Sequence, residues 1–423
     1  MKRFSFRISQ TRLLQAVQGF RFAANFILAI VLARLATKSQ LQDYESFMLL
    51  VSTISFSVLS GVSTAFLPEL SRNYSLDNWN AGIFATTMLG CILGVIGFVF
   101  SAFSGNSVAE SSLIAAVLVS QPISNLLEYQ LFFRELPKKT LIWSIFSSVA
   151  TVALGGVFFH YWGAVGCLSA VVLVAWIRTA AVLSQIIFPI KVRWKPILSW
   201  YGSWLPMIGV ALVAGIADYA DSWLVRYLWA ADFVGYRYGA RELPIATLLA
   251  NGISLTYSAK LAQRHNDNTF FINNLKEETR QFIWIMFGIT ATLMVFSKPL
   301  FLVVYGADFT QAADIFFWYL FLSIPRGLFP QILLIGYGSY QAQFWITAIE
   351  TTAHLILSIL FITTFGPVGA AISAIISYSL EKVLLWAYCR SKNWPVNEIA
   401  PVKTWLTTTI LTIILGILVY LWR

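Results

Sequence analysis

Residues 162–176 have the sequence WGAVGCLSAVVLVAW, and residues 365–379 have the sequence FGPVGAAISAIISYS. In both stretches an aromatic residue and a glycine precede a second glycine, and a long apolar run follows. Their first glycines, Gly163 and Gly366, are 203 residues apart. A weaker match, at an offset of 192, joins residues 34–44 to residues 226–236. These matches indicate that the two halves of the chain are copies of one internal repeat.

The composition is that of a membrane protein. Of the 423 residues, 58% are hydrophobic and 11% are charged, whereas a soluble protein carries roughly 25% charged residues. About 20 apolar residues cross a hydrocarbon core as a helix, and lipid offers other backbone conformations no hydrogen-bond partners. The predicted spans are 13–35, 44–69, 81–103, 111–133, 140–160, 163–188, 203–228, 233–259, 281–303, 309–335, 341–364, 366–388 and 403–422.

The predicted fold class is therefore an all-α polytopic membrane protein. The repeat assigns six helices to an N-terminal lobe, residues 1–190, and six to a second lobe, residues 191–390. Because six is even, both lobes have the same orientation, which gives a parallel repeat around a central cavity. Residues 391–423 add one further C-terminal helix. Two such lobes favour a transporter over a channel, a receptor or a membrane enzyme.

Loop charges predict the orientation in the membrane. If the N-terminus is cytoplasmic, nearly all loop Lys and Arg residues are cytoplasmic too, and only Lys38 and Arg423 lie outside. This asymmetry explains the net charge of +10 without any nucleic-acid partner. The basic N-terminus is expected to begin an uncleaved first helix of a bacterial inner-membrane protein. The long internal loop 260–280 is expected to lie as an amphipathic helix on the cytoplasmic surface.

Ionisable side chains within the spans should face a cavity or a partner, because charge is costly in lipid. Depth along the helices predicts the ion pairs Asp221–Arg241 and Arg326–Glu350, and these pairs have either a packing role or a functional one. Spare arginines suit a phosphate or diphosphate, whose oxygens a guanidinium binds in a bidentate way. The cationic cavity candidates are Arg21, Arg178, Arg237, Arg241 and Arg326.

Acidic and histidine residues supply a second set of candidates, for ion coupling or internal ion pairs. His354 lies one helical turn from Glu350, and a histidine there suits proton coupling because it titrates near neutral pH. The candidates are Asp218, Asp221, Glu242, Glu350 and His354.

The sequence lacks three common motifs, for phosphate binding, for metal binding and for a catalytic serine. The chain has no phosphate-binding G-x-x-x-x-G-K-[ST] loop, no H-E-x-x-H and no G-x-S-x-G. Its three cysteines show no metal-site spacing, so we expect no catalytic residues, no metal and no cofactor. Glycan polymerases and ligases usually have a large outward loop, which this chain lacks.

Three stretches resemble the polysaccharide-repeat-unit (O-antigen) flippases of the MOP superfamily, which also contains the lipid II flippases and the MATE drug exporters. They are FLPELSRNY (residues 66–74), FSKPLFLVVYGADFTQAADIFFWYLF (residues 296–321) and FGPVGAAISAIISYSLEKVLLW (residues 365–386). The resemblance covers about residues 1–390. It implies alternating access, driven by an ion gradient, that moves an undecaprenyl-diphosphate-linked oligosaccharide to the periplasmic leaflet. Other polysaccharide assembly proteins are the implied partners, besides the lipid-linked oligosaccharide and the bilayer.

Two other transporters remain as alternatives. A MATE-like exporter of cationic drugs would use an acidic cavity, for which Asp218 and Asp221 are the best candidates. A lipid II flippase is the other alternative, although its relatives are typically longer and have fourteen helices.

Overall fold

The computed structural model describes most of the chain. The described residues are 10–72, 76–133, 137–184, 219–240 and 268–423, with a few single positions between 198 and 261. Contacts divide the chain into two compact units, Met1–Gly215 and Ile216–Arg423. The predicted lobes 1–190 and 191–390, with the additional segment 391–423, remain predictions about how the chain is organised.

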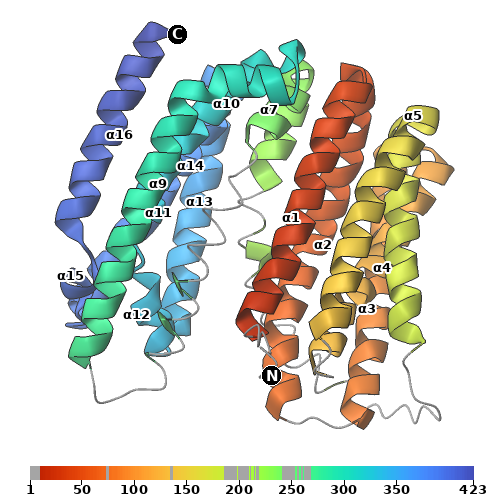
Figure 1. The fold of residues 1–423 in the computed structure, drawn as a ribbon, viewed down its shortest axis with the longest axis horizontal. Coiled ribbons are helices and arrows are strands. Elements are labelled where there is room, and N and C mark those ends of the chain that lie inside the picture. The colour runs from red at the N-terminus through yellow and green to blue at the C-terminus, as the bar shows by residue number, and fades with distance from the viewer. Residues whose placement is uncertain are drawn as a thin grey trace, which may run out of the picture. The chain divides into compact units, whose positions relative to one another are not determined.

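The first unit is a bundle of long helices (Figure 1). Helix α3 packs on α4, α4 and α1 pack on α5, and α2 contacts α3, α4 and α5. A capping box starts α4, because Glu110 accepts a hydrogen bond from the Ser107 backbone N–H and Ser107 Oγ accepts one from that of Glu110. The helices are α1 (Gln10–Leu35), α2 (Lys38–Arg72), α3 (Leu76–Phe103), α4 (Val108–Phe133) and α5 (Pro137–Leu183).

Helix α5 contains two predicted spans, 140–160 and 163–188, and breaks between them at Gly163 (φ 60°, ψ −144°). The second unit contains the matching break at Gly366 (φ 65°, ψ −151°), between α13 (Tyr340–Phe365) and α14 (Val368–Ser391). A residue other than glycine is strained at such a positive φ. The two matched motifs therefore have the same backbone break at their first glycine.

The second glycine of each motif allows close packing inside its hairpin. A Cβ added to Gly166 would overlap the carbonyl oxygen of Phe158, and one added to Gly369 would overlap that of Phe361. Both the glycines and the phenylalanines are 203 residues apart. The same backbone contact is thus built twice, once in each unit.

The second unit contains shorter elements besides its long helices. It includes a described helical segment, residues 219–228. The other elements are η1 (Ala230–Asp232), α7 (Phe233–Gly239), α9 (Asn268–Val304), η2 (Ala307–Phe309), α10 (Thr310–Tyr319), η3 (Leu320–Leu322), α11 (Ser323–Arg326), α12 (Gln331–Gly336), α13, α14, α15 (Val396–Ile399) and α16 (Val402–Trp422).

Two sequence predictions about this unit are wrong. The predicted single span 309–335 consists of α10, η3, α11 and α12, and it is interrupted between Arg326 and Gln331. Pro325 and Pro330 lack the N–H that an unbroken helix needs, which explains the interruption. The predicted separate surface helix 260–280 is also wrong from Asn268 onward, because those residues form the continuous start of α9. The predicted spans 203–228 and 233–259 lie partly outside the described residues.

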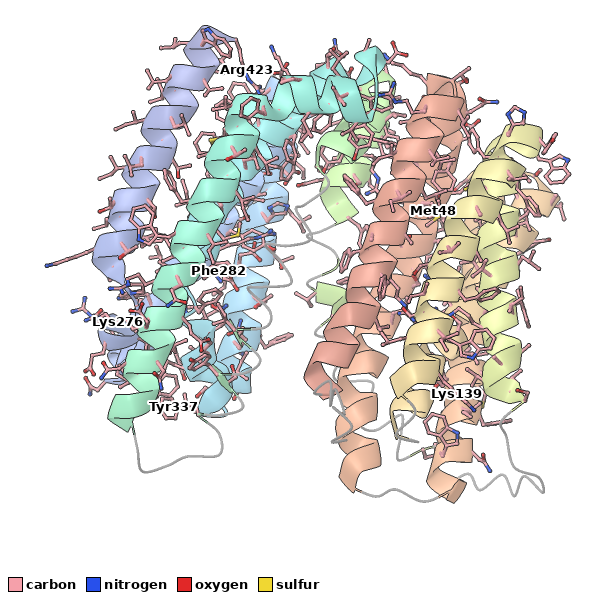
Figure 2. The ribbon with its side chains drawn as sticks, in the orientation of Figure 1. Met48, Lys139, Lys276, Phe282, Tyr337 and Arg423 are labelled. Carbon is pink, nitrogen blue, oxygen red and sulfur yellow. The ribbon has the colours of Figure 1, made fainter. Side chains whose placement is uncertain are left out.

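Helix α16 is attached near both of its ends. The Trp405 indole N–H donates to the Ile324 carbonyl over 2.8 Å, and the Arg423 guanidinium donates to Asp314 Oδ1 over 2.9 Å. Figure 2 shows Arg423 at one end of this unit, with Lys276 and Tyr337 at the other. Helix α16 leaves many large apolar side chains exposed, as contact with lipid requires, and they include Ile410, Ile413, Ile414, Ile417, Leu418 and Leu421.

Six helices of the described chain are long and apolar enough to cross a membrane. They include α16, which was predicted as the additional C-terminal span. The protein is therefore a multi-pass membrane protein. The six are Trp79–Phe103, Leu141–Leu183, Ile272–Val304, Gln341–Phe365, Val368–Ser391 and Val402–Trp422.

The hairpin contact gives a stability prediction. Gly369→Ala should destabilise the protein by roughly 1–3 kcal/mol, because its Cβ would overlap backbone that cannot move aside. Gly288→Ala in α9 is the matched control, since nothing lies within 4 Å of the added Cβ. The thermal unfolding midpoint of the purified protein in detergent should fall for Gly369→Ala and not for Gly288→Ala. Equal midpoints would contradict the packing described.

Candidate functional site

A buried histidine on α13 is the centre of a polar cluster in the second unit. His354 Nε2 lies 3.2 Å from Asp221 Oδ2, and the two side chains are only 5% and 6% exposed. His354 Nδ1 lies 2.9 Å from Ser377 Oγ on α14. The second carboxylate oxygen of Asp221, Oδ1, is buried and makes no hydrogen bond to any residue that the structure describes.

The cluster extends along the middle of the α13–α14 hairpin as a seam of paired polar residues. Glu350, His354 and Ser358 recur every four residues on α13, so they share one face of that helix. Ser373, Ser377 and Glu381 recur in the same way on α14.

The two rows meet in antiparallel register. Ser358 Oγ is 2.9 Å from Ser373 Oγ, and His354 pairs with Ser377. Glu350 and Glu381 interact electrostatically at the third position. We call these six residues the polar seam.

Charged groups surround the Glu350 end of the polar seam. Glu350 is buried and interacts with the Ser377 hydroxyl, with His354 and with Lys382. The Lys382 ammonium lies 2.9 Å from Glu381 Oε2 and donates to Gln331 Oε1 on α12 over 3.4 Å. The two acidic residues at this end therefore share one lysine.

Polar residues of α7 and α10 lie near Asp221. The Tyr236 and Tyr319 hydroxyls are 3.3 Å apart, and Tyr236 is within electrostatic reach of Asp221. Arg237 donates to Ser222 Oγ over 3.4 Å. A cation and two phenols thus lie close to the Asp221 end of the cluster.

One of the two predicted ion pairs is absent from the described residues, and the other is not tested by them. Asp221 pairs with His354, whereas its predicted partner, Arg241, lies outside the described residues, as do Asp218 and Glu242. No ion pair joins Arg326 to Glu350 within the described structure: the Arg326 guanidinium lies over the Tyr378 ring, 5.4 Å from its centroid. Arg326 and Glu350 were predicted to lie at the same depth in the membrane, but their side chains face different neighbours.

Arg178 has a packing role in the first unit. It is 7% exposed and donates to Ser147 Oγ over 2.9 Å and to the Ser124 carbonyl over 3.1 Å. Subtracting the repeat offset of 203 from Glu350 and Glu381 gives Ser147 and Arg178. This pair therefore occupies the position that the two glutamates occupy in the second unit. Arg21, on α1, is half-buried.

The serines Ser358, Ser373 and Ser377 were missed by sequence analysis. Their four-residue spacing matches that of Glu350 and His354, and this match could have identified them. Register in a helical hairpin follows from its turn, so counting outward from Gly366 would have paired the two rows.

Arg178 gives a second prediction. Arg178→Met should destabilise the protein by roughly 1–3 kcal/mol, because the buried Ser124 carbonyl and Ser147 hydroxyl lose their donor. Lys139→Met, at an exposed position on α5, is the control for loss of a cation. Thermal unfolding in detergent measures both variants. An unchanged midpoint for Arg178→Met would refute the packing role.

The chain is similar to one known protein family and to several solved structures. The family described as "Lipid II flippase MurJ" matches residues 142–423. No curated protein matches the chain.

Among solved structures, a lipid II flippase MurJ in an inward closed conformation is 15% identical, with a TM-score of 0.65, and the match covers 97% of each chain. An inward-facing multidrug resistance MATE transporter of the MOP superfamily is 14% identical (TM-score 0.64, 88% of this chain and 94% of that one). A MOP superfamily transporter from Pyrococcus furiosus is 13% identical (TM-score 0.58, 90% and 93%). These structures establish the fold that the chain shares.

Proposed function

Because this chain belongs to the lipid II flippase MurJ family, we propose that it moves lipid II, a lipid-linked glycan precursor, across the bacterial inner membrane. The chain is a MOP superfamily transporter, and this family contains transporters rather than enzymes. The observation that carries the proposal is the family match, which spans all described elements of the second unit. The N-terminus would be cytoplasmic and transport would run toward the periplasmic leaflet.

The family match favours lipid II over the O-antigen repeat unit that the sequence resemblance implied. Length does not separate this chain from a lipid II flippase, since the structural match covers 97% of both chains. Both candidate substrates carry a diphosphate on a lipid, so the same cationic groups would serve either of them.

Arg237 and Arg326 are the proposed diphosphate contacts. Both are half-buried, and each lies in the second unit near the polar seam: Arg237 reaches Ser222, and Arg326 lies over Tyr378 of α14. Guanidinium groups keep their charge in such surroundings and match phosphate oxygens geometrically. Arg21 and Arg241 remain candidates for the same role, whereas the hydrogen bonds of Arg178 support a packing role.

A drug exporter is less well supported. The carboxylate proposed to attract a cationic drug, Asp221, pairs with His354 of the same unit. A carboxylate that is buried and already engaged with a partner of its own unit is poorly placed to attract a cationic ligand.

Leaflet-resolved measurement of lipid II tests the proposal. In cells depleted of their own lipid II flippase, this chain should restore cleavage of lipid II by an enzyme added outside. Arg237→Ala and Arg326→Ala should each lower the transport rate by roughly 10- to 100-fold, the value of one charge-assisted hydrogen bond of about 1.5–3 kcal/mol.

Arg280→Ala is the control, because Arg280 is exposed and pairs with Glu277 on the same helix. If the chain restores export of an O-antigen repeat unit and leaves lipid II transport unchanged, the O-antigen repeat unit is the substrate in place of lipid II. Restoration of neither would reject a lipid-flipping function.

A further inference from the structure

We propose that Trp405 of α16 is a positioning residue for Arg326, one of the two arginines assigned to the lipid diphosphate. Trp405 acts through α11, the last helical turn before the interruption of its span, which ends at Arg326. Because this role assumes that Arg326 contacts a diphosphate, it rests on the proposed function. The attachment of α11 to α16 does not depend on any substrate.

The end of α11 leaves Arg326 at a weak point of the span. The last four carbonyl groups of a helix have no donor within that helix, and α11 consists of only four residues, Ser323–Arg326. The residue four positions after Arg326 is Pro330, which has no N–H to donate to the Arg326 carbonyl. The position of α11 therefore depends on its neighbours, and it contacts α9, α14 and α16.

The Trp405 indole supplies the donor that the helix end lacks. In an unbroken helix the Ile324 carbonyl would accept the N–H of Leu328, but that N–H donates to the Pro325 carbonyl over 3.4 Å. The Gly327 N–H donates to the Ile324 carbonyl over 3.2 Å in a tighter turn. The Trp405 indole N–H donates to the same carbonyl over 2.8 Å, the shortest of these three bonds. A carbonyl oxygen accepts two bonds, so both donors can be present together.

Trp405 contacts the chain on both sides of Arg326. Ile324 lies two residues before Arg326, and Gly327 follows it directly. A Cβ added to Gly327 would lie 3.2 Å from Trp405 Cδ1 and 3.3 Å from Ile283 Cγ1, which is tighter than most side-chain contacts. The glycine thus leaves the space in which the indole packs. Because the indole touches the residues before and after it, the backbone of Arg326 is fixed from α16.

The side chain of Arg326 is supported from the opposite element, α14. Its guanidinium carbon lies 5.4 Å from the centroid of the Tyr378 ring, within the range of a cation–π contact. Trp405 thus fixes the backbone, and Tyr378 supplies the surface along which the side chain lies. A ligand-binding group loses much of its effect when it is displaced by about 1 Å, so the binding strength of Arg326 should depend on both contacts.

Helix α16 is itself anchored, so Trp405 is a fixed point for α11. Arg423 donates to Asp314 of α10 over 2.9 Å. A Cβ added to Gly416 would overlap the ring of Phe321 in η3, so the two elements approach closely. Helix α16 therefore contacts the interrupted span at α10, at η3 and at α11, and Trp405 makes the contact at α11.

Hydrogen exchange tests the attachment without any substrate. Trp405→Phe keeps an aromatic ring and removes only the indole N–H. Exchange at the Gly327 and Leu328 amides of the purified full-length protein should become roughly 3- to 10-fold faster, the effect of losing one hydrogen bond. Trp422→Phe is the matched control, because Trp422 lies on the same helix and is 81% exposed. Equal exchange in the wild type and Trp405→Phe would overturn the attachment.

Binding of undecaprenyl diphosphate tests the positioning. This probe carries the lipid diphosphate that both candidate substrates share, and it has no glycan. Trp405→Phe should raise its Kd roughly 3- to 10-fold, while Arg326→Ala raises it roughly 10- to 100-fold. Trp422→Phe should leave the Kd unchanged. A wild-type Kd in Trp405→Phe would refute the positioning role.

A double-mutant cycle separates positioning from a general loss of stability. In the Arg326→Ala background, Trp405→Phe should raise the Kd no further, because Trp405 acts through Arg326 alone. The same loss in both backgrounds would assign Trp405 a merely structural role and reject the proposal.

Gly327→Ala provides a second variant if Trp405→Phe folds poorly. Its Cβ crowds the indole and changes no charge, so it should weaken binding when Arg326 is present and not in the Arg326→Ala background. An equal effect in both backgrounds would again reject positioning.

The outcomes separate this role from the proposed function. Binding that depends on Arg326 but not on Trp405 would reject the positioning role and support the lipid-diphosphate substrate. A wild-type protein that binds no undecaprenyl diphosphate, but whose Gly327 and Leu328 amides still exchange faster in Trp405→Phe, would reject the substrate and support the attachment.

Discussion

Every polar side chain that enters the hydrocarbon must find its partner inside the protein, since lipid supplies none. The α13–α14 hairpin meets this constraint by pairing polar residues at three successive positions of the same register. Serines close one end, the His354–Ser377 pair occupies the middle, and two glutamates with a shared lysine occupy the other end. Because every contact depends on the alignment of the two helices, the turn at Gly366 controls the chemistry of the whole row.

The two units show how one backbone serves two purposes. Their hairpins have nearly the same dihedral angles at Gly163 and Gly366. At the repeat offset, His354 and Ser358 correspond to Thr151 and Gly155, while Ser373 and Ser377 correspond to Ala170 and Val174. At these positions the first unit has small or apolar residues, and its Arg178–Ser147 contact lies where the second unit has Glu381 and Glu350. Glu350 and His354 of the second unit thus lie at positions where the first unit has Ser147 and Thr151.

Sequence analysis predicted the features that depend on neighbouring residues. Apolar runs located α1 to α4, both parts of α5, and the helices α13, α14 and α16, and the glycine motif located both hairpins. It failed where the outcome depends on distant packing. Depth along a helix suggested Arg326 as the partner of Glu350, but rotation about the helix axis decides which side chains meet, and α11 ends at the break beside Pro330. The partner of Asp221, His354, is 133 residues away and could not be inferred from local pattern.

The attachment of α16 has a consequence for biogenesis. The interrupted region between α11 and α12 receives an indole N–H from Trp405, and Asp314 receives the guanidinium of Arg423. Both donors are synthesised after every other helix of the chain. During translation the broken span must therefore wait in the bilayer or the insertion machinery without these two contacts. These two contacts of the second unit can form only after Trp405 and Arg423 have emerged from the ribosome.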